Sequence, residues 1–164
     1  MTRSEFYKPA GLKGEKPVPS ILVDADKLLG LILRAELMMN AKDRRRYSDR
    51  AVNLILEVIE EFTLAYDFED ERYHHLKRMW CKITSLIHLM RQIGKVDAIR
   101  IHPKYETMTP DQMKIELMNT IASLDEGATS WKKSVVRTEK ERRKSHGNKG
   151  MTGSDGWNRQ SPEE

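Results

Sequence analysis

One glutamate–histidine pair has the spacing that metal sites in helical proteins use. Glu71 and His74 are three residues apart, as in the carboxylate-bridged di-metal sites inside helical bundles. Such a site needs a second pair and two more inward-facing glutamates, and the sequence offers a single pair. His74 and His75 are neighbours, which point about 100° apart on a helix and do not grip one ion together. We therefore predict no metal and no other cofactor.

Nucleophilic and phosphate-binding motifs give no catalytic site either. Cys81, the single cysteine, lies beside an apolar stripe with no evident base, which predicts a buried structural thiol. Arg142 and His146 have a spacing similar to the basic pair of bundle-type ribonucleases, but the segment around them is expected to be disordered, and catalysis needs rigid placement. The glycines within residues 147–153 follow no strand, so they form no phosphate loop. We therefore expect a protein that is not an enzyme.

Clusters of basic residues are the remaining candidates for a functional surface. The net charge is only +4, so basic character matters only where it is concentrated. Each cluster is either a solvated helix face or a contact to RNA phosphates or an acidic protein surface. Arg78 and Lys82, four residues apart, share one helix face. The predicted partner-binding residues are Arg44, Arg45, Arg46, Arg72, Lys77, Arg78, Lys82, Lys132, Lys133 and Arg137.

A long amphipathic helix that begins near Met108 is the clearest element that could position these residues. Thr109 is a good N-cap, and Pro110 suits the first helical position because that position needs no N–H donor. Apolar residues then follow at steps of three and four, the period of a helix with one buried face. They are Met113, Leu117, Ile121, Leu124, Ala128, Trp131 and Val135. A charged extension of this helix is expected to reach about Lys144.

Three further helices are predicted, over residues 20–40, 48–66 and 70–93. Ser48 or Asp49 is the expected N-cap of the second, and Gly94 the expected C-cap of the third. Glu57, Glu60 and Glu61 are assigned to the solvent face of the second helix. The predicted core residues are Leu28, Leu31, Ile32, Ala35, Met38 and Met39 in the first helix, Ala51, Val52, Leu54, Ile55, Val58, Ile59 and Phe62 in the second, and Leu76, Met79, Trp80, Ile83, Leu86, Ile87, Met90 and Ile93 in the third.

These elements predict an all-α protein, an up-down-up-down four-helix bundle. We expect a flexible N-terminal arm at residues 1–19, the bundle at residues 20–138, and a basic extension followed by a Gly-rich, disordered tail at residues 139–164. The connection over residues 95–107 is long for a bundle, and a short extended piece is possible there. The lack of an apolar signal segment or membrane span predicts a cytoplasmic protein, and the single cysteine suits a reducing compartment.

Two short motifs give the sequence a family resemblance. The run Met108-Thr109-Pro110-Asp111-Gln112 and the pair Ser130-Trp131 resemble the start and end of the last helix in the accessory variability determinant (Avd) proteins of diversity-generating retroelements. Arg78 and Lys82, which flank Trp80, resemble a basic pair in the same family. The four-helix proteins encoded in intervening sequences of ribosomal RNA genes share the plan and remain an alternative. The resemblance covers about residues 22–138.

The resemblance to Avd proteins implies a function. Avd proteins are homopentamers of four-helix bundles without catalytic activity, and they bind a reverse transcriptase and its template RNA. The complex makes adenine-mutagenised cDNA that diversifies a target gene. The alternative is a helical-bundle adaptor that binds only proteins. If Arg78 and Lys82 are exposed binding residues, replacing both by alanine is expected to change stability by under about 0.5 kcal/mol.

Overall fold

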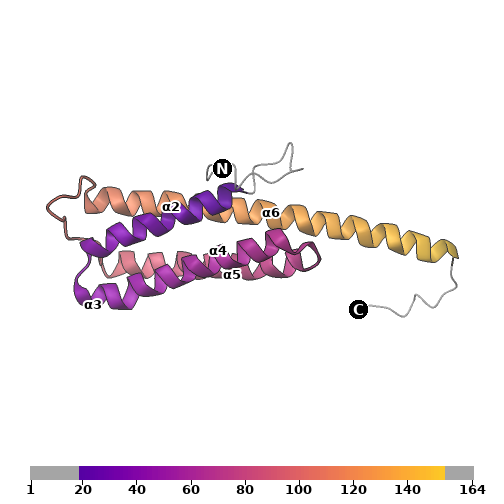
Figure 1. The fold of residues 1–164 in the computed structure, drawn as a ribbon, viewed down its shortest axis with the longest axis horizontal. Helices are drawn as coiled ribbons and strands as arrows, with labels where there is room; N and C mark the ends of the chain where they lie inside the picture. The colour runs from indigo at the N-terminus through magenta and orange to yellow at the C-terminus, as the bar shows by residue number, and fades with distance from the viewer. Residues whose placement is uncertain (1–18, 154–164) are drawn as a thin grey trace.

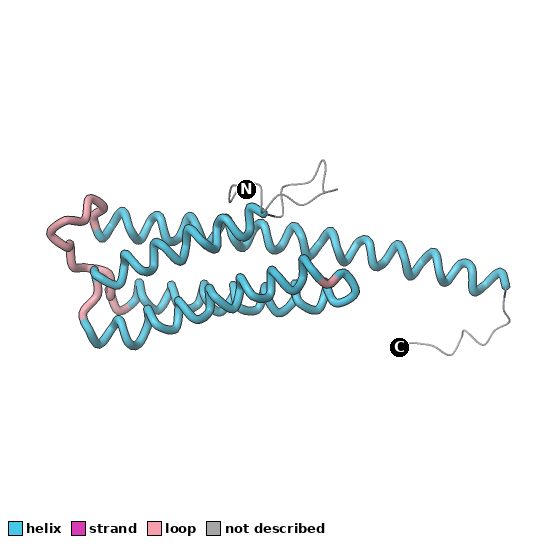
Figure 2. The backbone as a smooth tube through the Cα atoms, viewed as in Figure 1, coloured by secondary structure: helices cyan, strands magenta, loops and turns pink. Residues whose placement is uncertain are grey.

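The computed structural model describes residues 19–153, with side chains for residues 20–145. The described chain is all-α, as the sequence predicts, and contains no strand (Figure 2). The expected arm, apart from Pro19, and the end of the expected tail, residues 154–164, lie outside the described residues. The four long helices are α2 (Pro19–Ala35), α4 (Asp49–Asp67), α5 (Arg72–Lys95) and α6 (Pro110–Gly153). Shorter helical segments are η1 (Glu36–Met38), α3 (Ala41–Asp43), the π-helical turn η2 (Arg44–Ser48) and η3 (Glu69–Glu71).

Polar contacts give the direction in which neighbouring helices run. Ser123 Oγ of α6 donates to Asp24 Oδ2 of α2 over 2.7 Å, and Lys27 lies 3.8 Å from Glu116. A later residue of α2 therefore contacts an earlier residue of α6, so these two helices are antiparallel. Pairs between α4 and α5 follow the same rule, as described below. Figure 1 shows α4 and α5 lying together beside α2 and α6, and α6 continuing past the ends of the other helices.

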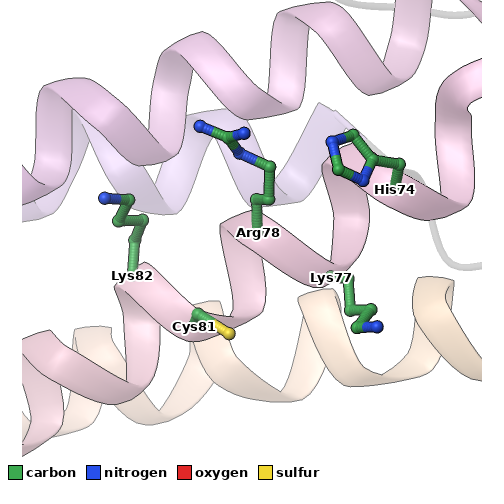
Figure 3. A pocket seen from close by; sticks show the side chains of 5 residues that line it. All are labelled: His74, Lys77, Arg78, Cys81 and Lys82. Carbon is green, nitrogen blue, oxygen red and sulfur yellow. The ribbon is translucent and has the colours of Figure 1, made fainter.

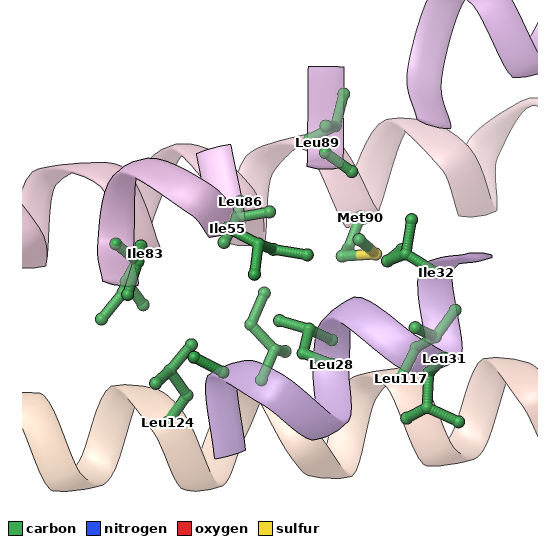
Figure 4. Close-up of a cluster of buried hydrophobic side chains, with 14 of the residues drawn as sticks. Leu28, Leu31, Ile32, Ile55, Ile83, Leu86, Leu89, Met90, Leu117 and Leu124 are labelled. Atoms are coloured by element: carbon green, nitrogen blue, oxygen red, sulfur yellow. The ribbon is translucent and has the colours of Figure 1, made fainter. Parts of the chain in front are cut away.

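Apolar side chains from all four helices fill the space between them (Figure 4). Six of the seven residues predicted for the stripe of α6 are buried, and the seventh, Val135, packs against the core from its edge. The predicted core residues of the first helix are all buried, but α2 ends at Ala35 and not near Asn40, so Met38 and Met39 lie beyond it. In α4 and α5 most predicted core residues are buried, while Val52, Leu54, Ile59, Trp80 and Ile87 are half-buried. The helical period therefore identified the core correctly, since burial follows the apolar face.

The start of the second long helix differs from the prediction. Asn40 is the N-cap, because its side chain accepts a hydrogen bond from the Asp43 N–H over 2.8 Å. Ser48 is buried and helical, and its hydroxyl donates to Glu36 Oε1 over 2.7 Å instead of capping. The prediction of a cap at Ser48 or Asp49 was therefore wrong. The chain turns at residues 36–40, and Arg44 to Arg46 lie within helix.

The end of the third long helix also differs. Gly94 lies inside α5, and the helix ends at Lys95, so the predicted C-cap was wrong. The left-handed residue is Asp97, with φ of 50°, a conformation that aspartate tolerates better than most side chains. The following residues, Ala98 and Ile99, are buried and hold the connection against the bundle. The backbone N–H groups of Arg100 and Ile101 donate to the Met38 carbonyl without forming a strand.

The start of α6 carries the predicted cap and a second, reciprocal bond. Thr109 Oγ1 accepts from the Gln112 N–H over 3.1 Å, and Gln112 Oε1 accepts from the Thr109 N–H over 2.9 Å. Together these bonds form a capping box. Glu106 fixes the preceding loop, because its carboxylate accepts from the Arg34 guanidinium, which lowers the pKa of Glu106 to about 2.

The far end of α6 lies beyond the predicted limit near Lys144, since the helix continues to Gly153. Among the described side chains, its last buried residue is Trp131, so the part beyond the core is long. Among the described residues, every helix is too short or too polar to cross a lipid bilayer.

Candidate partner-binding surfaces

Two of the predicted binding cations are paired with acids of the same chain. Arg78 Nε donates to Glu61 Oε2 over 2.9 Å, and Lys82 Nζ lies 3.0 Å from Glu57 Oε1. The assignment of Glu61 to the solvent face was wrong, because Glu61 is 5% exposed. His75 Nδ1 lies 2.8 Å from the other Glu61 oxygen, so two side chains of α5 hold one buried carboxylate of α4.

Arg72 also has a structural role. Its guanidinium donates to the carbonyls of Ala65 and Tyr66 over 2.8 and 3.2 Å. These carbonyls belong to the last turn of α4, where carbonyl groups lack helical partners and cations are favoured. The Arg72 guanidinium also lies 5.9 Å from the ring centre of Trp131 in α6. Arg72 therefore links three helices and is less available to a partner than the sequence suggested.

The basic residues of α5 and α6 lie side by side, as the order of the helices predicts. Lys132 Nζ lies 4.2 Å from the ring centre of Trp80, a cation–π contact between the two helices. Trp80 is half-buried beneath Lys132, so its assignment to the core holds only in part. Lys77 Nζ lies 6.0 Å from the ring centre of Tyr73. In this region, too, the cations contact aromatic faces of their own chain.

An open hollow on α5 brings several of these side chains together (Figure 3). It is lined by His74, Lys77, Arg78, Cys81 and Lys82. Cys81 is exposed, so the prediction of a buried thiol was wrong. Met79 and Ile83 lie on the apolar face of α5 that packs into the core. Cys81, midway between them in sequence, projects from the opposite face of the helix.

Arg44, Arg45 and Arg46 form the arginine turn, and they differ from the α5 cations. All three are exposed, and within the described residues none of them has an ion-pair or hydrogen-bonding side-chain partner. The two residues that follow, Tyr47 and Ser48, are buried and fix the π-helical turn against the bundle. The arginine turn therefore presents adjacent positive charges from an anchored backbone.

Lys133 and Arg137 are the other predicted cations that are exposed and without a partner in the described part of the chain. They lie on α6, at the end of the bundle opposite α3 and the arginine turn (Figure 1). The predicted site residues therefore separate into cations held by their own chain and two unpaired groups at opposite ends.

The acids that pair with α5 were not predicted, although the sequence carries a signal for them. Glu57 and Glu61 are four residues apart on α4, and Lys82 and Arg78 are four apart on α5. On antiparallel helices these two spacings match, so once Glu61 lies opposite Arg78, Glu57 lies opposite Lys82. His75, the second partner of Glu61, had no comparable signal.

Within the described part of the chain, no group of three or more His, Cys, Asp or Glu side chains is placed to hold a metal ion. Comparison of the chain with protein-family models, with curated proteins and with solved structures found no match.

Proposed function

We propose that this protein is a non-catalytic accessory factor of a diversity-generating retroelement. It binds the reverse transcriptase and its template RNA and supports mutagenic cDNA synthesis. The observation that carries the nucleic-acid part is the arginine turn, where Arg44, Arg45 and Arg46 are exposed on a fixed backbone with no acidic partner among the described residues. The motifs at Met108–Gln112 and Ser130-Trp131 support the retroelement part through their resemblance to Avd proteins.

Charge repulsion makes the arginine turn informative. Three adjacent guanidinium groups repel one another, and only Asp43 and Asp49 lie close to them in sequence. A phosphate backbone relieves this repulsion, since each guanidinium can donate two parallel hydrogen bonds to one phosphate. Arg78 and Lys82 of α5 need no external partner, because Glu61 and Glu57 already neutralise them. RNA binding is therefore assigned first to the arginine turn.

The finer architecture belongs to the same proposal. We place an up-down-up-down bundle in the cytoplasm as a homopentamer, with the arm and the tail outside the bundle. The antiparallel contacts described above support the up-down-up-down order of the helices. Exposed apolar side chains on the bundle surface suit subunit contacts, because an oligomer would cover them. They include Leu37 on η1 and Leu56 on α4, which are 59% and 48% exposed.

The same exposed leucines favour a second function, a protein–protein adaptor without a nucleic-acid role. The two functions predict different genomic neighbourhoods. A retroelement factor is encoded near a reverse transcriptase and a pair of repeats that differ at adenines. If these neighbours are missing, and the protein fails to bind RNA, the adaptor is the better account.

RNA binding should depend on the arginine turn. Replacing Arg44, Arg45 and Arg46 by alanine is expected to lower the affinity for single-stranded template RNA by roughly 100-fold at 0.1 M salt. Each lost phosphate contact reduces the slope of log affinity against log salt by about 0.7, so three lost contacts reduce it by about 2. Fluorescence anisotropy with labelled RNA at several salt concentrations measures both quantities. Helicity and melting should stay unchanged, since these side chains are exposed.

The matched control is the triple lysine variant at the same positions. It keeps the charge, so its salt slope should equal that of the wild type, while its affinity falls by less than that of the alanine variant. A folded alanine variant that binds RNA like the wild type would remove the arginine turn from the RNA site. If that variant loses only the reverse transcriptase, the turn contacts protein instead.

A further inference from the structure

The end of α6 extends past the bundle and carries most of its charge there. Trp131 is the last buried residue of the helix among the described side chains, and residues 137–145 are exposed apart from the half-buried Glu139. Figure 1 shows this part of α6 without another helix beside it. A helix that is polar on all sides gains little from packing, so its surface is available to a partner.

The cations on this extension are arranged along one side of the helix. Lys133, Arg137, Lys140 and Lys144 follow at steps of four, three and four, which places them in a narrow stripe about 16 Å long. All four are exposed, and none has an ion-pair partner within the described residues. The stripe lies on the side opposite Trp131 and Val135, which face the bundle.

Two arginines lie outside the stripe. Arg143 follows Lys140 by three residues and lies on a flank of the stripe, about 60° from it. Arg142 lies on the far side and pairs with Glu139 over 3.1 Å, which neutralises one of the two acids on this segment. Positive charge is therefore spread over more than one side of a single uncovered helix.

We propose that residues 133–145 of α6 bind duplex DNA by lying in its major groove. The groove of B-form DNA is about 12 Å wide and admits one α-helix, whose diameter with side chains is about 10–12 Å. A helix in the groove has a phosphate strand on each side, which suits cations on a stripe and on its flank. Phosphate contacts alone carry no sequence information, so the binding is independent of sequence.

The shape of the groove distinguishes DNA from RNA as the partner. Duplex RNA has a deep, narrow major groove that a helix does not enter. The extension should therefore prefer duplex DNA to duplex RNA of the same length and sequence. This inference does not rest on the proposed function, since the extension lies at the opposite end of the bundle from the arginine turn (Figure 1).

The test uses the full chain with Lys140 and Lys144 replaced by alanine. Two lost phosphate contacts should reduce the salt slope for a 20-base-pair DNA by about 1.8, which corresponds to roughly 60-fold weaker binding at 0.1 M salt. The wild type should bind the matched RNA duplex less tightly than the DNA duplex. Replacing the same two lysines by arginine is the control and should preserve DNA binding.

Four results would overturn this proposal, provided that circular dichroism shows both variants to be folded. The first is an alanine variant that binds the DNA duplex like the wild type. The second is equal wild-type affinity for the two duplexes, which would indicate a general polyanion surface. The third is tighter binding to single strands than to the DNA duplex, and the fourth is loss of an acidic protein partner without loss of DNA. The Arg44–Arg46 alanine variant should bind the DNA duplex like the wild type. The RNA proposal for the arginine turn and the DNA proposal for α6 are therefore tested separately.

Discussion

Replacing Leu28 by alanine is expected to lower the free energy of unfolding by about 2–5 kcal/mol. Leu28 is completely buried on α2, within the cluster that joins all four long helices (Figure 4). The substitution removes apolar contacts and leaves a cavity that the surrounding helices refill only in part. Denaturant unfolding followed by circular dichroism measures the loss, as a lower midpoint with an unchanged slope.

Leu33 provides the matched control, since it is the same residue type on the same helix. Its side chain is 49% exposed, so Leu33→Ala should change stability by under about 0.5 kcal/mol. Both substitutions alter helix propensity equally, and the difference between them reports burial alone. Equal effects of the two substitutions would mean that α2 does not present its Leu28 face to the core.

Arg78→Ala is the second substitution with a large expected effect, about 1–3 kcal/mol. Arg78 itself is 56% exposed, but its partner Glu61 is almost entirely buried and would lose a charge-assisted hydrogen bond. His75 remains on the other oxygen of Glu61, which keeps the expected loss below that of a wholly unpaired buried charge. Thermal melting of the single variant gives the value.

Lys82→Ala is the natural comparison for Arg78→Ala. Lys82 and Glu57 are both partly exposed, and ion pairs of this kind contribute less than about 1 kcal/mol. The structure therefore revises the expectation that losing Arg78 and Lys82 together costs almost nothing. A double-mutant cycle measures the coupling energy between Glu61 and Arg78, and a value near zero would contradict a stabilising contact between them.

The helical period allowed the core to be predicted, because burial of one face is a local property of each helix. The stripe from Met113 to Trp131 needed only the spacing of its apolar residues. Helix ends were harder to predict. Gly94 is the residue type that usually ends a helix, yet α5 passes through it, and Asp97 takes the left-handed conformation instead. Packing of Ala98 and Ile99 against the bundle decides where the chain can turn.

The candidate site was predicted less well, since pairing between helices is not a local property. Arg78 and Lys82 were placed correctly on one face of α5, but the acids facing them belong to α4, and their register follows only from the packing. Serine is a residue type that often caps helices, but the Ser48 hydroxyl donates to the Glu36 carboxylate in a part-buried contact. The helix is capped by Asn40 instead. That exchange places Arg44 to Arg46 on a helical turn, where their side chains diverge toward solvent.

Reconstitution of cDNA synthesis tests the proposed function most directly. The proposed partner, a reverse transcriptase encoded near this protein, would be assayed on its template RNA with the wild-type protein, with the Arg44–Arg46 alanine variant, and with no added protein. We predict that adenine-mutagenised cDNA requires the wild-type protein and falls to the level without added protein when the alanine variant is used. Equal yields of cDNA with and without the wild-type protein would contradict the account.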